Sequence, residues 1–188
     1  GTPADSIVFR SASATPTSTD WIGIALEAPV SSSFEHCVFM HAENALSLLE
    51  AEVDVTKCSF RNCGTGLYLR GVTSNVTSCS FAAGTFTAIY LQGPTCKPLI
   101  RECNITVGDF SAAAAPYNVF CISYSNAPNV YVDARYNWWG SSDESEISQT
   151  IFDETFSGGH VNVDFEEWYS EPGVESRSWG AIRAMFID

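Results

Sequence analysis

Three charged residues have the types and spacing that acid–base chemistry requires. Glu102, Asp133 and Arg135 fall on neighbouring units of an internal repeat. Two carboxylates held one unit apart could shift each other's pKa, so that one serves as general acid and the other as general base. The alternative is a surface network of ion pairs in which Arg101 and Arg135 neutralise the two carboxylates. The residue types alone leave both interpretations open.

Two tyrosines are a candidate binding surface. Tyr68 and Tyr90 hold equivalent positions in adjacent repeat units, and both are expected to point outward. Aromatic faces can seat sugar rings, so the pair could bind a glycan. The alternative is ordinary packing between neighbouring side chains of one sheet.

Two sequence motifs are acceptors for N-linked glycans. They are "NVT" at Asn75 and "NIT" at Asn104, and their use would indicate secretion. Asn104 is expected on the outer face of its strand. A glycan there would obstruct that face and favour a non-catalytic role.

The chain contains seven cysteines, so at least one thiol has no disulfide partner. Cys96 is expected in a turn, and Cys121 at an outward position equivalent to that of Tyr68 and Tyr90. These two cysteines could form a disulfide. The cysteine count by itself does not indicate the redox compartment.

These residues are positioned by a repeat of about twenty-one residues, a period typical of solenoids. The stretches "SFEHCVF", "DVTKCSF" and "NVTSCSF" each place a cysteine two residues before a phenylalanine, and "IRECNI" continues the series. The expected first-strand column runs through Ile7, Cys37, Cys58, Cys79, Cys103 and Ala134, and its partner column through Phe9, Phe39, Phe60, Phe81, Ile105 and Tyr136. Both columns should face the core, because side chains two residues apart share one face of a strand.

A second alternating strand follows each of the first strands. Its inward side chains are expected to be Ile24, Leu46, Leu67, Ile89 and Phe120, together with Leu26, Leu48, Leu69, Leu91 and Ile122. Stacking the units at about 4.8 Å would build parallel sheets around one core. In-register cysteines have parallel Cβ directions, which a disulfide does not tolerate. The cysteine column is therefore predicted to be a buried ladder of thiols.

The chain resembles the right-handed parallel β-helix proteins of the pectin-lyase-like fold. The resemblance rests on the "V-T-x-C-S-F … G-L-Y-L" unit, on "DWIGIAL" near the start, and on "ARYNWWG", which resembles an Asn-x-Trp-Gly closing element. It implies an all-β, right-handed, single-stranded parallel β-helix, here of about six coils over residues 5–140. Sugar-cleaving members act on the outer face of the first strand, but their Asn-Thr-Asp, Asp-Asp and Arg-Ile-Lys motifs are absent here.

Residues 141–188 are expected to form a C-terminal cap. Trp138 or Trp139 should cover the last coil, followed by a short helix with Ser142 as its N-cap. The alternating segment "HVNVDF" predicts a final strand, and "SWGAIRAMF" (178–186) could begin another coil. A cap of this kind would protect the open strand edges that a solenoid leaves at its end.

The net charge of −13 excludes nucleic acid and anionic membrane surfaces as natural partners. No apolar run approaches the roughly 20 residues that a membrane-spanning helix needs. Between Arg135 and Arg177 the chain has ten carboxylates and no lysine or arginine. This segment predicts a solvated acidic face, with a calcium site as the alternative.

Residues 1–188 are expected to form a single domain and, because the chain begins without methionine, part of a larger protein. The favoured hypothesis is a non-catalytic extracellular module, either a rigid scaffold or a recognition surface for glycans or other extracellular proteins. The alternative is a polysaccharide lyase or glycoside hydrolase, because this fold hosts both enzymes and scaffolds. The absent motifs favour the module.

Overall fold

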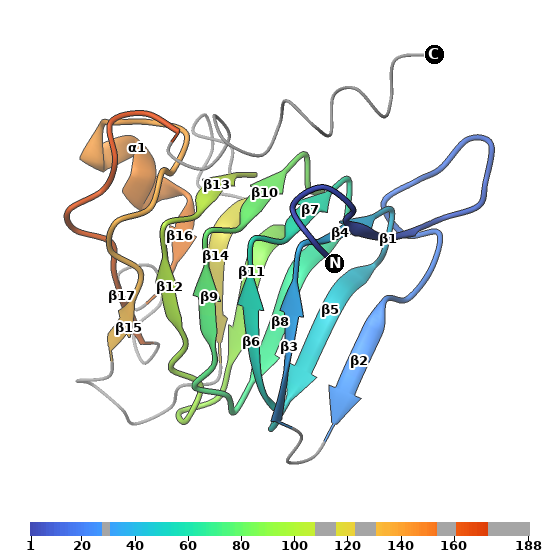
Figure 1. The fold of residues 1–188 in the computed structure, drawn as a ribbon. Helices are drawn as coiled ribbons and strands as arrows, with labels where there is room; N and C mark the ends of the chain where they lie inside the picture. Colours follow the sequence, from blue (N-terminus) through green and yellow to red (C-terminus); the bar gives the residue numbers. More distant parts are fainter. Residues whose placement is uncertain (28–30, 108–115, 123–130, 154–160, 173–188) are drawn as a thin grey trace.

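The protein is a parallel β-helix in a computed structural model that describes residues 1–27, 31–107, 116–122, 131–153 and 161–172 (Figure 1). The first sheet contains β1 (Ile7–Arg10), β4 (Cys37–Met40), β7 (Ser59–Arg61), β10 (Ser80–Ala82) and β13 (Asn104–Thr106). The second contains β2 (Ile24–Glu27), β5 (Asn44–Leu49), β8 (Thr65–Arg70), β11 (Thr87–Gln92), β14 (Tyr117–Ile122) and β16 (Ile151–Phe152). The third contains β3 (Ser31–Glu35), β6 (Glu52–Thr56), β9 (Asn75–Thr77) and β12 (Leu99–Arg101). Neighbouring strands are parallel, which confirms the predicted stacking.

The solenoid has about four complete coils, so the prediction of six was wrong. Four successive coils contribute a strand to each of the three sheets. The fifth contributes β13 and β14, but its next strand, β15 (Tyr131–Asp133), pairs with β17 (Asn162–Asp164). The prediction assigned one coil to each first strand in the sequence, whereas a complete coil has a strand in all three sheets.

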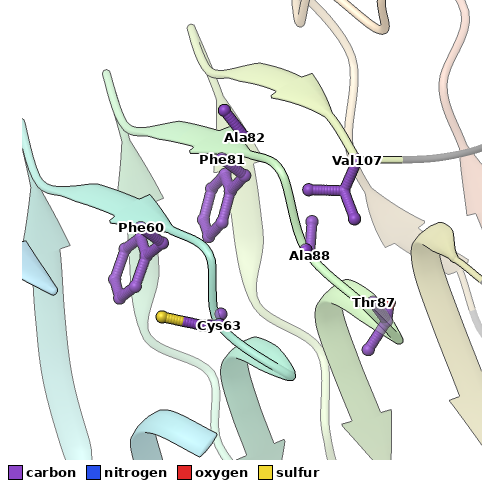
Figure 2. Close-up of a pocket in the computed structure, with 9 residues that line it drawn as sticks. Phe60, Cys63, Phe81, Ala82, Thr87, Ala88 and Val107 are labelled. Atoms are coloured by element: carbon purple, nitrogen blue, oxygen red, sulfur yellow. The ribbon is translucent and has the colours of Figure 1, made fainter. Parts of the chain in front are cut away.

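A column of stacked phenylalanines fills the core. Ring centroids are 5.0 Å apart from Phe9 to Phe39, 5.0 Å from Phe39 to Phe60 and 4.8 Å from Phe60 to Phe81. Figure 2 shows Phe60 and Phe81 one coil apart with their rings aligned, and Cys63 beside them. The gap that these side chains line holds about 10 Å³, roughly the space of one water. This part of the core is therefore packed and offers no ligand site.

The predicted ladder of buried thiols is confirmed. Cys37, Cys58, Cys79 and Cys103 are at most 4% exposed, and none is in a disulfide. The backbone N–H of Cys79 donates to Cys103 Sγ at 3.4 Å, and Cys79 Sγ donates to Val55 O at 3.4 Å. Burial raises the pKa of the Cys79 thiol well above its usual value. The ladder is thus a set of buried core residues.

The second strand of the fifth coil is shifted by one residue from the predicted register. Tyr90 is paired with Phe120, and Leu91 with Cys121. Val119 and Cys121 are fully buried, so Phe120 points outward rather than inward and Cys121 inward rather than outward. The segment "VFCI" is apolar at every position, so alternation could not define its register. A slip of one residue exchanges the two faces of a strand.

The closing segment was also misaligned, by three residues. Asn104 forms a bridge with Trp138, so Trp139 continues the aromatic column that was assigned to Tyr136. Trp139 is fully buried. Asn137 takes the place expected for Ala134: its Oδ1 accepts from the backbone N–H of Cys103 at 2.8 Å and its Nδ2 donates to Ile100 O at 2.8 Å. The side-chain amide of Asn137 thus links the closing segment to Ile100 and Cys103 of the preceding coil.

A short helix, α1 (Glu144–Gln149), follows Trp139 at the end of the solenoid away from β1 and β2 (Figure 1). Its N-cap is Asp143, not the predicted Ser142: Asp143 Oδ1 accepts from the backbone N–H groups of Ser145 and Glu146 at 2.8 and 3.2 Å. The helix buries Ile147, and the predicted final strand is present as β17. The segment 178–186 lies outside the described residues. Within the described ranges no helix is long and apolar enough to cross a membrane.

Residues with positive φ mark the corners of the coils. Between the third and first sheets these are His36, Lys57, Ser78 and Glu102, with φ between 52° and 57°, and Tyr136 and Glu167 follow β15 and β17 with φ of 58° and 57°. None of them is a glycine, although side chains raise the energy of this conformation. The repeated stacking of coils therefore holds each corner in a conformation that the residue alone does not favour.

We expect Phe60→Ala to destabilise the fold by about 3–5 kcal/mol, because it leaves a cavity between two stacked rings. Tyr131→Ala is the control, since Tyr131 is 58% exposed; it should change stability far less. The measurement is urea unfolding followed by circular dichroism. Equal effects of the two substitutions would show that the ring column contributes little.

We expect Asn137→Leu to cost about 3 kcal/mol or more, because it removes the amide that pairs with the buried N–H of Cys103 and with three backbone carbonyls. Asn75→Leu makes the same change at an exposed asparagine and should cost less than about 1 kcal/mol. Chemical unfolding of both variants tests this. A wild-type unfolding midpoint in Asn137→Leu would contradict the linking role.

Candidate functional site

The structure places Asp133 in an ion-pair network rather than beside Glu102. Asp133 accepts hydrogen bonds from Arg101 and from Arg135, whose Nε and Nη2 lie 3.1 and 3.0 Å from its oxygens. Arg135 also lies 3.6 Å from Asp164 and 3.9 Å from Glu167. Two carboxylates of this network thus come from β15 and β17, so it joins these two strands.

Electrostatics keep Asp133 ionised. Hydrogen bonds from Arg135, and then from Arg101, hold the pKa of Asp133 well below its usual range despite partial burial. The pKa of Arg135 is raised by the same contact. A carboxylate with so low a pKa does not donate a proton near neutral pH, and an arginine held protonated is a poor base.

Glu102 has separate surroundings. Its Oε2 accepts from Ser78 Oγ at 3.0 Å, and its backbone N–H donates to Tyr136 O at 2.9 Å. Tyr136, not Asp133, therefore occupies the equivalent position in the next coil. Among the described residues, no hydrogen bond or ion pair joins Glu102 to Asp133. The three candidate catalytic residues are not brought together as an acid–base pair.

The outer face of the first sheet, where sugar-cleaving β-helix enzymes act, is buried at four positions from β4 to β13, although Val8 of β1 is 43% exposed. Val38, Ser59, Ser80 and Asn104 point away from the core, yet they are 4, 8, 7 and 1% exposed. Neither amide atom of Asn104 has a hydrogen-bond partner in the structure. Glycosylation of Asn104 stays a prediction.

The other sequon is accessible. Asn75 is exposed on β9, and its Nδ2 donates to Asp54 Oδ1 at 2.9 Å. A glycan on Asn75 would project from the third sheet without entering the core. Its use stays a prediction.

Cys96 and Cys121 are both fully buried, and the structure holds them as thiols. Burial, then the neighbouring charges of Asp153 and Cys96, raises the pKa of the Cys121 thiol well above its usual value. A disulfide between these cysteines stays a prediction, now at a pair of inward positions rather than at the surface.

An aromatic ladder lies on the outer face of the second sheet. Ring centroids are separated by 4.9 Å between Tyr68 and Tyr90, 5.4 Å between Tyr90 and Phe120, and 4.6 Å between Phe120 and Phe152. All four side chains are partly exposed. Sequence reasoning found the two tyrosines but missed Phe120 and Phe152. The one-residue register error placed Phe120 in the core, and β16 was not expected in this sheet.

The ladder ends at Tyr68. One face of its ring stacks on Tyr90, and its hydroxyl donates to Gln92. Toward the N-terminal coils the register positions next to Tyr68 are Ser47 and then Ala25, neither of which has a ring. The inner rings of the ladder face one another, whereas Tyr68, at one end of the ladder, has a second face that no ring of the ladder covers.

An open groove of about 370 Å³ runs beside this end of the ladder. Its lining consists of Thr19, Glu43, Asn44, Gly64, Thr65, Tyr68, Thr85, Phe86 and Tyr90. The volume lies within the roughly 300–1,000 Å³ typical of small-molecule sites. The groove combines aromatic surface with hydroxyl, amide and carboxylate groups. Such a set can hold a polar ring compound by stacking and hydrogen bonds.

Calcium binding stays a prediction. Among the described residues no group of three or more His, Cys, Asp or Glu side chains is arranged to hold a metal ion. Part of the acidic stretch, including residues 154–160, lies outside the described ranges.

Comparison with known proteins gave no match: no protein-family model, curated protein or solved structure is significantly similar to this chain.

The ion pairs of Asp133 predict a pH-dependent stability. Because its pKa is lower in the folded protein, the contribution is fully present above the unfolded value of about 3.9 and is lost as the pH falls toward the folded value. The stability difference between wild type and Asp133→Asn should be largest near neutral pH and shrink below about pH 4. Urea unfolding across this range measures it. A difference that stays constant with pH would contradict the assignment, and Arg135→Gln should weaken the dependence.

Proposed function

We propose that the protein is a non-catalytic, extracellular β-helix module that binds carbohydrate on the outer face of its second sheet. The observation that carries the proposal is the partly exposed aromatic ladder ending at Tyr68 beside an open polar groove. The rigid stack of coils serves as the scaffold, and the solenoid is proposed to be of the pectin-lyase-like type.

Stacking supports this assignment. Aromatic rings bind the apolar face of a sugar, while hydroxyl and amide groups around them bind its hydroxyls. Tyr68 offers a ring held in place by Tyr90 and by a hydrogen bond to Gln92. A preorganised ring loses little side-chain entropy on binding, which favours affinity.

The alternative, a polysaccharide lyase or hydrolase, has less support. Asp133 is committed to two arginines, and Glu102 stands apart from it. On the outer face of the first sheet, Val38, Ser59, Ser80 and Asn104 are buried.

The binding test uses a panel of soluble oligosaccharides and isothermal titration calorimetry. Tyr68→Ala should weaken binding roughly tenfold, the upper range of one aromatic contact. Ser47→Leu should weaken it similarly by covering the open ring face without opening the core, whereas Ser47→Ala should leave it unchanged. Tyr131→Ala, at an exposed tyrosine off the ladder, is the control. Unchanged affinity in both Tyr68→Ala and Ser47→Leu would show that the aromatic ladder is not part of the binding site.

Catalysis is tested separately with acidic and neutral polysaccharides, with and without calcium. We expect no product. Cleavage that Glu102→Gln or Asp133→Asn abolishes while the fold is retained would overturn the non-catalytic assignment.

A further inference from the structure

The groove lining contains one acidic residue, Glu43, and no basic residue. Glu43 is exposed at its edge and makes no ion pair with any described residue. The other polar groups of the lining are neutral, and no lysine or arginine contributes to it. An exposed acidic residue thus shares the groove lining with three aromatic residues, Tyr68, Phe86 and Tyr90.

Glu43 is held by its backbone, and its carboxylate makes no hydrogen bond or ion pair with another described residue. Its N–H donates to Trp21 O at 2.7 Å, and its carbonyl accepts from Thr65 N at 2.7 Å. Its main chain is therefore fixed between two neighbouring coils, and the carboxylate remains available for a ligand. Gly64 at the adjacent position approaches closely, since a Cβ there would lie 2.6 Å from Glu43 O.

We propose that the groove selects a sugar with a free, protonated amine, a hexosamine, over a neutral sugar of the same shape and over a uronic acid. The ring stacks on the open face of Tyr68, and its ammonium group pairs with Glu43. This inference rests on the proposed function of the groove and specifies its ligand.

Two interactions favour the ammonium group. An ion pair with Glu43 is attractive at contact, and an ammonium near an aromatic face is attracted by the ring quadrupole. Tyr68, Tyr90 and Phe86 supply such rings in the same groove. A carboxylated sugar meets the reverse situation, because Glu43 repels it and no lining cation compensates.

The net charge of the whole protein also favours binding of a cationic sugar over an anionic one. The net charge of −13 raises the local concentration of cations and lowers that of anions around the protein. This long-range effect is removed by salt, with a Debye length of about 8 Å at physiological ionic strength. The contact with Glu43 and the long-range field can therefore be separated by experiment.

The experiment measures binding of three oligosaccharides of equal length and linkage: a glucosamine oligomer, its N-acetylated counterpart and the corresponding glucose oligomer. Calorimetry at low salt and a pH at which the amine is protonated should show a preference of about two- to fivefold for the free amine. A galacturonate oligomer should bind more weakly than all three.

Glu43→Gln should abolish the preference for the amine, measured as the ratio of the affinities for the glucosamine and glucose oligomers. Glu50→Gln is the matched control, because it removes the same charge from the same coil but lies outside the groove lining. It should retain the preference. Thermal unfolding of both variants verifies that the fold is intact.

The outcomes separate the two proposals. Equal binding of the amine and glucose oligomers by the wild type, or a preference that survives in Glu43→Gln, overturns the charge selection and leaves the carbohydrate site standing. A preference lost equally in both variants also overturns it, because the net charge rather than Glu43 then acts. Failure of all the oligosaccharides to bind overturns both proposals.

Discussion

The structure depends on one constraint: parallel hydrogen bonding places every residue directly above its equivalent in the previous coil. Equivalent residues of successive coils therefore lie about 4.8 Å apart, and each side chain must be able to pack against its equivalents in the neighbouring coils. Flat rings satisfy this spacing, as Phe39, Phe60 and Phe81 show with interplanar angles of 4° and 5°. Small thiols satisfy it equally well, which explains the cysteine ladder.

The same constraint explains the aromatic ladder on the outer face of the second sheet. Tyr68, Tyr90, Phe120 and Phe152 stack outside the second sheet for the reason that phenylalanines stack inside the first. A ladder of this kind hides the faces of its inner rings. Its binding capacity is therefore concentrated at its end, where Ser47 replaces an aromatic residue. The candidate binding site therefore lies at the coil in which the aromatic residue of the ladder position is absent.

The closing end shows how the stack is terminated. Asn137 and Asn118 are fully buried asparagines. The amide of Asn137 bonds backbone groups of the preceding coil, whereas that of Asn118 bonds the backbone of Val107 and Trp139 and the hydroxyl of Thr150 next to α1. Trp139 then covers the aromatic column. Side-chain amides replace the ladder bonds that a further regular strand would have made. The charged network around Arg135 ties β15 to β17 just outside this region.

The sequence by itself determined the class of the fold, the thiol ladder and two rungs of the aromatic ladder, because period and alternation survive in the residue types. It could not determine the register of "VFCI", where every residue is apolar, nor the alignment of Asn137, whose side chain takes a role normally held by backbone. Only the tertiary structure decided that Asp133 pairs with Arg101 and Arg135 while Glu102 bonds Ser78. It alone brought Glu43, Thr65 and Phe86 to one groove beside Tyr68, because residues from separate coils become neighbours only through stacking.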